Sequence, residues 1–308
     1  MRRPTPLAGL LLASLLPAGA PGAESPPIDR KSDVIYGRKF GTALTMDVFT
    51  PAKANGGAVV MVVSGGFFSS HEAINPGSFG PLLDRGYTVF AVVHGSQPKF
   101  TVPEIVADVN RAVRFIRHHA RDYAIDPERI GVTGASAGGH LALMLGTAGT
   151  PGDPEALDPV ERESSRVRTV ACFFPPTDLL NYGAPGVEKI HPRDFDRPFR
   201  PAFDYHELDQ ASNLWVPVVD DGKLREAARK VSPIAHVTPD DAPTLIVHGE
   251  ADKLVPVQQS QVIVEKFRAA GVEARLVVKP GAGHGWRGMS QDLGAFADWF
   301  DQHMKPSK

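Results

Sequence analysis

A chain of 308 residues, 42% hydrophobic and 22% charged, has the composition of an ordinary globular protein and can form one large α/β domain. Its formal net charge of -2 provides no basic surface for nucleic acid and argues against that class of partner. The single cysteine, Cys172, excludes an intrachain disulfide, and its apolar neighbours indicate an inert buried thiol.

The N-terminal residues have the layout of a secretory signal peptide. A positively charged start precedes an unbroken run of small and apolar residues over 7–16, which is too short to span a bilayer. We expect cleavage after Ala23, because the other candidate cut would leave Pro21 at the new terminus. Residues 1–23 are therefore predicted to be removed, and 24–308 to be secreted or periplasmic without stable membrane insertion. Retention of the segment as an N-terminal anchor is the alternative.

Strand and helix patterns alternate along the mature chain, after a polar linker predicted over 24–32. Continuous β-branched runs at 58–63 and 88–93 predict strands covered on both faces. Apolar residues at helical spacing then predict a helix over 102–123. A short strand at 129–133 follows and leads into an apolar helix. Further strands are expected at 44–49, 167–174, 244–247 and 274–278, and further helices at 257–270 and at the C-terminus. This alternation predicts an α/β fold with a mostly parallel central sheet flanked by helices.

One segment breaks this rhythm. Residues 181–232 are rich in proline and carry several aromatic side chains among many charges. We expect a lid-like insertion that leaves the sheet after the strand ending near Phe174, within a single domain. Because ligands bind at the carboxyl ends of strands in open α/β sheets, Trp215 and Tyr205 are expected to contact the substrate. A loop that merely packs on the sheet edge is the alternative.

The sequence Gly134-Ala135-Ser136-Ala137-Gly138 matches the pattern Gly-x-Ser-x-Gly. A predicted strand comes before it and a predicted helix after it. In that setting the chain pivots directly from strand to helix, with the serine in a strained conformation and the glycines leaving room for the turn. The pattern therefore predicts a nucleophile elbow with Ser136 as the nucleophile.

A serine hydroxyl is a weak nucleophile until a base takes its proton. At an elbow of this kind the acid and the histidine follow the serine in that order. Asp252 stands at the tip of the turn after the strand at 244–247, and His284 lies between two glycines after the strand at 274–278. We expect His284 to be the general base and Asp252 to orient it. Asp178, which also follows a strand, is the alternative acid.

Four other histidines have a pattern that suggests a role. His140 follows the elbow on its helix and is expected to be packed. The adjacent His118 and His119 point away from each other on a helix and make a poor metal pair. His94, at a strand end, either lines the pocket or caps the strand. No phosphate loop, dinucleotide fingerprint or metal-ligand spacing is present, so no cofactor and no metal are expected.

Four motifs occur in order along the chain, and together they resemble those of α/β-hydrolase serine esterases. They are Ser64-Gly65-Gly66-Phe67, Gly134-Ala135-Ser136-Ala137-Gly138-Gly139-His140-Leu141-Ala142, His248-Gly249-x-x-Asp252-x-x-Val255-Pro256 and Gly283-His284-Gly285. The chain is similar over roughly 34–304 to hormone-sensitive-lipase-like carboxylesterases and to bifunctional feruloyl and acetyl xylan esterases. The resemblance implies a catalytic triad and oxyanion donors at Gly66, Phe67 and Ala137. The chain departs from these families at Ser64 and Phe67, where they usually have His and Gly or Ala, but a backbone N–H is kept whatever the side chain.

These observations predict a secreted carboxylic ester hydrolase that acts through an acyl-serine intermediate. The expected substrates are short-chain acyl esters or acetyl and feruloyl esters of carbohydrates, with Phe68 and Trp286 also contacting them. A serine peptidase similar to prolyl oligopeptidase is one alternative, which the glycine-rich oxyanion loop disfavours. A catalytically silent hydrolase fold used for binding is the other. The oligomeric state has no signal in the sequence.

Overall fold

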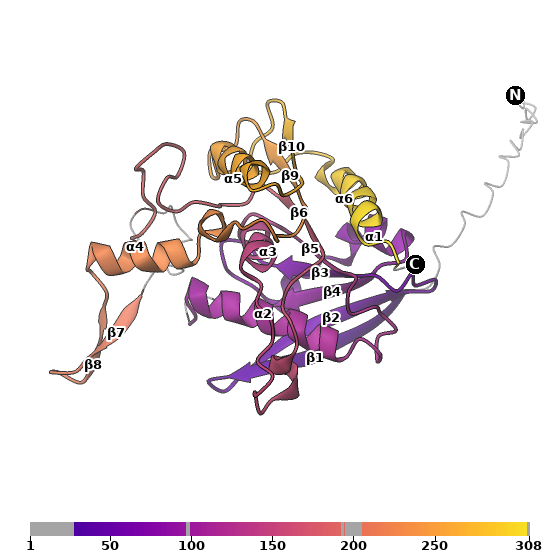
Figure 1. The fold of residues 1–308 in the computed structure, drawn as a ribbon, viewed down its shortest axis with the longest axis horizontal. Helices are drawn as coiled ribbons and strands as arrows, with labels where there is room; N and C mark the ends of the chain where they lie inside the picture. Colours follow the sequence, from indigo (N-terminus) through magenta and orange to yellow (C-terminus); the bar gives the residue numbers. More distant parts are fainter. Residues whose placement is uncertain (1–27, 97–98, 192–193, 195–204, 307–308) are drawn as a thin grey trace, which may run out of the picture.

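The computed structural model describes residues 28–96, 99–191, 194 and 205–306. The predicted signal peptide at 1–23 lies outside these residues. Within them, an eight-stranded sheet forms the centre of the molecule, and helices cover both of its faces (Figure 1). Among the described residues, no helix combines the length and the apolar character needed to cross a membrane.

The central sheet has the strand order β1-β2-β4-β3-β5-β6-β9-β10. All pairs from β4 to β10 are parallel, whereas β1 pairs antiparallel with β2, and β2 antiparallel with β4. The strands are β1 Ile28–Lys39, β2 Thr42–Pro51, β3 Ala58–Val63, β4 Thr88–Val93, β5 Ile130–Ala135, β6 Thr169–Phe173, β9 Thr244–Gly249 and β10 Ala274–Lys279. The prediction of a mostly parallel sheet is confirmed. The predicted linker at 24–32 is wrong in its second half, because Ile28 already pairs with Pro51.

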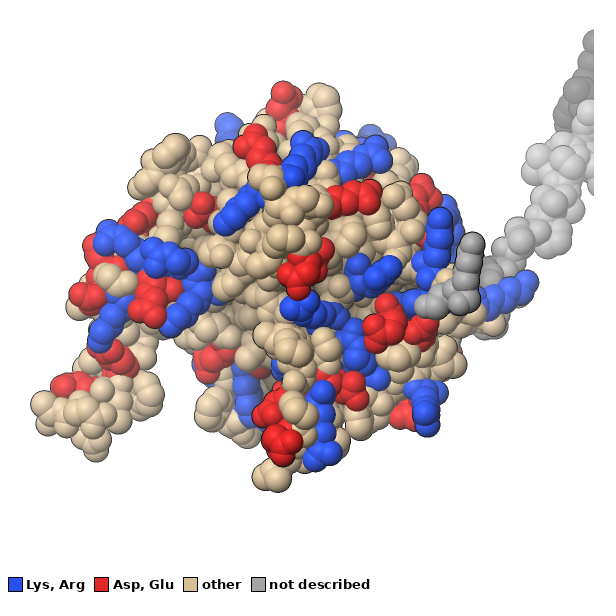
Figure 2. Space-filling view, viewed as in Figure 1, with Lys and Arg blue, Asp and Glu red and all other residues tan. Residues whose placement is uncertain are grey.

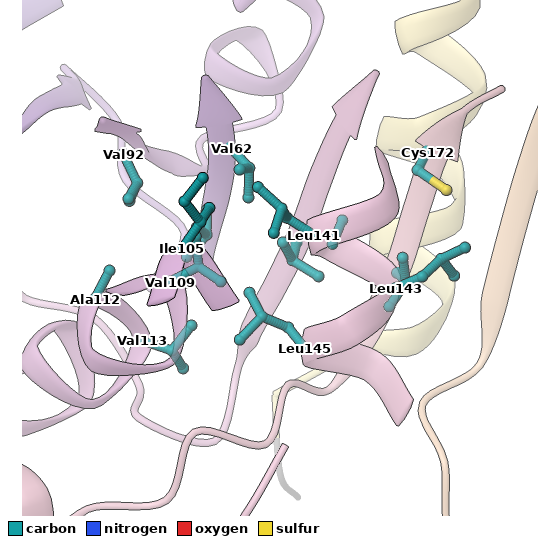
Figure 3. Close-up of a cluster of buried hydrophobic side chains, with 14 of the residues drawn as sticks. Val62, Val92, Ile105, Val109, Ala112, Val113, Leu141, Leu143, Leu145 and Cys172 are labelled. Carbon is teal, nitrogen blue, oxygen red and sulfur yellow. The ribbon is translucent and has the colours of Figure 1, made fainter. Parts of the chain in front are cut away.

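Alternating side chains along the central strands supply two separate hydrophobic cores. Val60 and Val62 of β3 belong to one core, and Val59 and Val63 belong to the other. This is the two-residue period of a strand that is buried on both faces. Buried side chains of α2 (Val102–His118), α3 (Ala137–Ala148), α4 (Asp221–Lys230) and α5 (Gln258–Ala269) complete the first core, and those of α1 (Gly80–Asp84) and α6 (Met289–His303) complete the second. Figure 3 shows the first core, where Val62 and Val92 of the sheet lie opposite Ile105 and Leu141 of the helices.

The sequence predicts helices at the positions of α2, α3, α5 and α6, with different ends, but it does not predict α1 and α4. Short 3-10 turns lie at His71–Ala73, Pro76–Ser78, Pro159–Arg162 and Pro233–His236. Helix α2 begins with a capping box between Thr101 and Glu104 and ends five residues before the predicted Tyr123.

The predicted insertion at 181–232 contains structure of its own. After the described residues around 181–191, a separate antiparallel pair forms from β7 (His206–Asp209) and β8 (Leu214–Pro217), and α4 follows. Figure 1 shows this hairpin projecting from α4 away from the central sheet. On the face shown in Figure 2, positively and negatively charged side chains are interspersed over the surface. The sheet and its two cores form the scaffold on which the loops at the strand ends are placed.

Candidate active site

The turn from β5 into α3 has the geometry of a nucleophile elbow. Ser136 sits at the turn with φ 54° and ψ -119°, a conformation that an L residue adopts only under constraint. A Cβ on Gly134 would lie 2.5 Å from the carbonyl carbon of Gly138, and a Cβ on Gly138 would lie 2.6 Å from the carbonyl oxygen of Val62. Only glycine fits at both positions. The predicted strained turn is therefore present, and it holds Ser136 at the carboxyl end of β5.

Ser136, His284 and Asp252 form one hydrogen-bonded line. The Nε2 atom of His284 lies 3.0 Å from Oγ of Ser136, and its Nδ1 atom lies 2.7 Å from Oδ2 of Asp252. The three residues come from the turns after β5, β10 and β9, so the parallel strands bring them to one edge of the sheet. The phenyl ring of Phe174, 4.4 Å from the His284 ring, packs against the imidazole. The structure thus brings together the three residues that the sequence singles out.

Asp252 is held as an ionised carboxylate. Its side chain is fully buried, and its Oδ1 atom accepts hydrogen bonds of 2.9 Å from the backbone N–H groups of Leu254 and Val255. Burial raises the pKa of Asp252, but contacts with His248 and His284 and the backbone N–H of Val255 outweigh burial and hold the pKa below its ordinary value. The carboxylate therefore stays charged and can stabilise an imidazolium at His284.

Asp178, the alternative acid, has other partners. Its Oδ1 atom accepts hydrogen bonds from the backbone N–H groups of Leu180 and Asn181, and its Oδ2 atom accepts one from the Asn181 side chain. These contacts make a local turn of the kind that aspartate favours in loops. The carboxylate that bonds to His284 is that of Asp252.

The loop after β3 forms a tight turn beside Ser136. Gly65 and Phe68 exchange two backbone hydrogen bonds of 2.9 Å, and the two residues between them, Gly66 and Phe67, both have positive φ, at 57° and 64°. The backbone of Phe67 is strained in this conformation, whereas a glycine would adopt it without strain. Its ring is buried and packs edge-on against His140 at 5.2 Å between ring centroids. The packing of the ring fixes the turn, and His140 is packed as predicted.

One pocket of about 250 Å³ opens at the Ser136 hydroxyl. Gly66, Phe67, Ser136 and Ala137 line its base, which places all three predicted oxyanion donors around the nucleophile. Ala137 begins α3, and the first N–H groups of a helix have no acceptor within the helix. The arrangement can therefore hold a carbonyl oxygen next to an activated hydroxyl.

The side walls of the pocket come from two segments. Tyr182, Val187 and Lys189, from the first part of the insertion, form one wall, and residues 253–256 form another. Tyr182 ties the two walls together, because its hydroxyl donates a hydrogen bond of 2.8 Å to the carbonyl oxygen of Leu254. The insertion therefore reaches the pocket through residues that the sequence analysis did not single out.

None of the four predicted substrate-binding residues is among those that line this pocket. Tyr205 packs against the first core, and Trp215 is 69% exposed on the projecting hairpin. Trp286 packs against Phe173 and donates from its indole N–H to Asp292. Phe68 is partly exposed at the end of the turn after β3. The insertion therefore contributes Tyr182 and Val187 to the pocket wall, and not Tyr205 and Trp215. Tyr205 is held against the first core, and Trp215 lies on the projecting hairpin.

The sequence model of the family described as BD-FAE matches residues 46–267, which is more than half of the chain and includes Ser136 and Asp252. The chain belongs to the BD-FAE family.

Known relatives agree with this assignment. Esterase LipQ of Mycobacterium tuberculosis is 30% identical over 258 residues, which cover 82% of this chain and 56% of that protein. A solved carbohydrate esterase from gut microbiota, in truncated form, superposes with a TM-score of 0.70 at 25% identity, covering 91% of this chain and 99% of the other. Propionate-bound esterase Est2 of Thermogutta terrifontis superposes with a TM-score of 0.65 at 26% identity, covering 92% and 98%.

These likenesses confirm the predicted α/β-hydrolase fold and the resemblance to esterases. The relatives and solved neighbours bear the names of esterases and carboxylic ester hydrolases. The BD-FAE chain spans about half the length of the curated relatives it matches.

One group of side chains in the described part of this BD-FAE member has the spacing of metal ligands. Oxygen and nitrogen atoms of Asp33, Asp47 and His71 lie within 4.8 Å of one another. However, Arg30 already bonds to Asp47, with its Nη2 atom 2.6 Å from Oδ2. The guanidinium charge neutralises the buried carboxylate and repels a cation, so this group is better described as a buried ion pair than as a metal site.

Two buried histidines make the stability of this BD-FAE member sensitive to acid. Burial lowers the pKa of His94 and of His140 to about 4, compared with about 6.5 in an unfolded chain. Between these values the unfolded state binds more protons, so the free energy of unfolding falls as the pH drops, by about 3 kcal/mol for each histidine. Chemical denaturation measures the free energy of unfolding at each pH. We expect this free energy to fall less between about pH 7 and about pH 4.5 in His140→Gln than in the unaltered protein. The exposed His206→Gln should leave the decrease unchanged, and an equal decrease in both variants would contradict the expectation.

Proposed function

We propose that this protein hydrolyses carboxylic esters through an acyl-serine intermediate. The observation that carries the proposal is the hydrogen-bonded line from Asp252 through His284 to Ser136, with Ser136 lining the same pocket as Gly66 and Phe67. A serine with a hydrogen-bonded base, an acid behind that base and backbone donors in front is the arrangement that acyl transfer requires.

The proposed reaction proceeds in two halves. His284 takes the proton of Ser136 while Oγ attacks the ester carbonyl carbon, and the negative charge on the carbonyl oxygen is stabilised by backbone N–H groups at Gly66, Phe67 and Ala137. The bond to the alcohol oxygen then breaks, and His284 donates its proton to the leaving alcohol. A water molecule, deprotonated by His284, attacks the acyl-serine, and His284 returns the proton to Oγ of Ser136 as the acid is released. Asp252 stabilises the imidazolium in both halves.

We infer that the substrates are esters of short acyl chains or acetyl and feruloyl esters of carbohydrates. The solved neighbours support this inference, since one is named a carbohydrate esterase and another holds propionate. The signal-peptide pattern of residues 1–23 supports the further proposal that the protein is exported.

A substrate screen tests the proposal. The panel contains aryl esters of increasing acyl length, acetylated and feruloylated oligosaccharides and a proline-containing peptide amide. We expect turnover of short-chain or carbohydrate esters and an initial burst of alcohol equal to the enzyme concentration when deacylation is slow. Cleavage of the peptide alone would favour the peptidase alternative, and binding without turnover would favour the silent-fold alternative.

The pocket wall at Val187 offers a prediction about substrate size. Val187 is 46% exposed and lines the pocket from the insertion, so a larger side chain there narrows the space without disturbing a core. We expect Val187→Trp to lower kcat/KM for feruloyl esters about tenfold more than for an acetyl ester. Val219→Trp, at a 79% exposed position that does not line the pocket, is the matched control. Equal losses on both esters would show that Val187 does not face the bulky group.

A further inference from the structure

A buried histidine lies beneath the turn at Gly66 and Phe67. His94 follows β4, the strand next to β3, and is 3% exposed. Its Nδ1 atom lies 2.7 Å from the carbonyl oxygen of Gly95, and its Nε2 atom lies 2.8 Å from Oγ of Ser64. Both ring nitrogens are therefore bonded, one of them to the residue that begins the oxyanion turn.

The partners of His94 fix its protonation. A carbonyl oxygen only accepts, so Nδ1 carries the proton that is donated to Gly95. Burial lowers the pKa of His94 to about 4, which keeps the ring neutral at neutral pH. Nε2 is then a bare acceptor, and the Ser64 hydroxyl donates to it. The bond thus fixes the orientation of the Ser64 side chain.

His94 also holds the other end of the same loop. Its backbone N–H donates to Oγ of Ser69 at 3.2 Å, and that hydroxyl donates to the carbonyl oxygen of Val63 at 2.5 Å. Ser64 and Ser69 flank the turn in which Gly66 and Phe67 have positive φ. His94, the residue after the neighbouring strand, therefore binds the loop on both sides of the oxyanion donors.

The position of His94 is itself fixed by contacts of the next residue, Gly95, with the scaffold. The backbone N–H of Gly95 donates to Oδ2 of Asp108 at 2.8 Å, and Asp108 forms an ion pair with Lys39, with 2.7 Å between Nζ and Oδ1. Because Asp108 belongs to α2 and Lys39 to β1, the segment after β4 is braced by two elements of the scaffold.

We propose that His94 is a positioning residue of the oxyanion hole: by binding Ser64 and Ser69, it sets the backbone N–H groups of Gly66 and Phe67 at the distance that the transition state requires. His94 does not touch the substrate, since it is buried behind the loop. The proposal rests on the ester hydrolysis proposed above. Donors in an oxyanion hole act on the transition state more than on the bound substrate, so misplacing them lowers kcat and leaves KM nearly unchanged.

The test compares His94→Phe, Ser64→Ala and the double variant. His94→Phe keeps a planar aromatic ring, somewhat larger than imidazole, and removes the acceptor, and Ser64→Ala removes only the hydroxyl. We expect each single variant to lower kcat roughly 10- to 100-fold at similar KM, and the double variant to be no worse than the more affected single variant. His94→Gln, which can again accept from Ser64, should recover part of the loss. Binding of a trifluoromethyl ketone, whose adduct places an oxyanion in the hole, should weaken by the same factor as kcat/KM.

Tyr36→Phe is the matched control. The Tyr36 hydroxyl donates a hydrogen bond of 2.9 Å to the carbonyl oxygen of Val93, the residue before His94, but does not bond to the oxyanion loop. It should lower the melting temperature with kcat preserved. The proposal is overturned if Ser64→Ala, measured at full folding, keeps kcat at the level of Tyr36→Phe, or if the losses in the double variant simply multiply. Failure of the proposed function looks different, because the unaltered protein would then hydrolyse no ester at all.

Discussion

We expect Ser136→Ala to lower kcat/KM for a short-chain ester by at least about 10⁴-fold, because it removes the attacking oxygen and leaves only the oxyanion donors and binding. The fold should persist. The backbone N–H of Ser136 still donates to the carbonyl oxygen of Phe173, and the lost hydroxyl bonds only to His284 among the contacts of the described residues. Steady-state kinetics and a melting curve on the same preparation provide the measurement.

The control for that variant is Ser212→Ala, which removes an exposed hydroxyl that bonds to Asp209 on the projecting hairpin. It should leave kcat/KM unchanged. An organophosphate should label Ser136 in the unaltered protein and nothing in Ser136→Ala, as followed by mass spectrometry. Residual activity within about tenfold of the unaltered protein would rule out Ser136 as the nucleophile.

Asp252→Asn should lower kcat about 10⁴-fold, the second largest effect that we expect. The amide keeps the size of the side chain but replaces the charge that stabilises the His284 imidazolium. It also presents an N–H group to Nδ1, which favours the wrong tautomer of the ring. Two backbone N–H groups, of Leu254 and Val255, would still find an oxygen acceptor, so the turn should hold its shape.

Asp178→Asn is the comparison that decides the acid. Asp178 accepts two backbone hydrogen bonds within its own turn, and an amide oxygen can still accept from them. We expect a change in kcat of less than about fivefold for this variant. If Asp178→Asn proved more harmful than Asp252→Asn, the acid would have to be reassigned to the end of β6.

The elbow and its partners could be predicted from the sequence because their constraints are local. Gly134 and Gly138 are required by backbone contacts within a few residues of Ser136 or with the adjacent strand. Asp252 and His284 each stand directly after a strand with a clear apolar pattern, and parallel strands bring their carboxyl ends together. The order of the motifs along the chain then determines which of the three side chains is the nucleophile, which the acid and which the base.

Other features depend on which strands become neighbours, and a single sequence does not state this. Ser64 and His94 are thirty residues apart and meet only because β3 lies beside β4. His248 contacts Asp252 and bonds to the carbonyl oxygen of Val255, although its pattern reads as an ordinary strand residue. In the insertion, the place where the segment leaves the sheet and its aromatic residues predicted Tyr205 and Trp215 at the substrate, but the path of the chain puts Tyr182 in the pocket wall instead.

Strand β1 was missed for a different reason. Its first half has exposed side chains on both faces, so the alternation that marks a half-buried strand is absent. Antiparallel pairing with β2 holds the strand in place, and its only buried residues, Tyr36 and Gly37, come late.

Within the described part of the chain, the central sheet ends in two strands, β1 and β10, each paired on one side only. An unpaired strand edge is a template on which another chain can add and start aggregation. Here Arg30, Lys31, Arg38 and Lys39 lie along β1, and Arg275 and Lys279 lie on β10. Charged side chains along an edge disfavour the addition of a second copy, and the register shifts in β1 interrupt its ladder. These features of the edge strands oppose edge-to-edge association of two sheets, which a high protein concentration would otherwise favour.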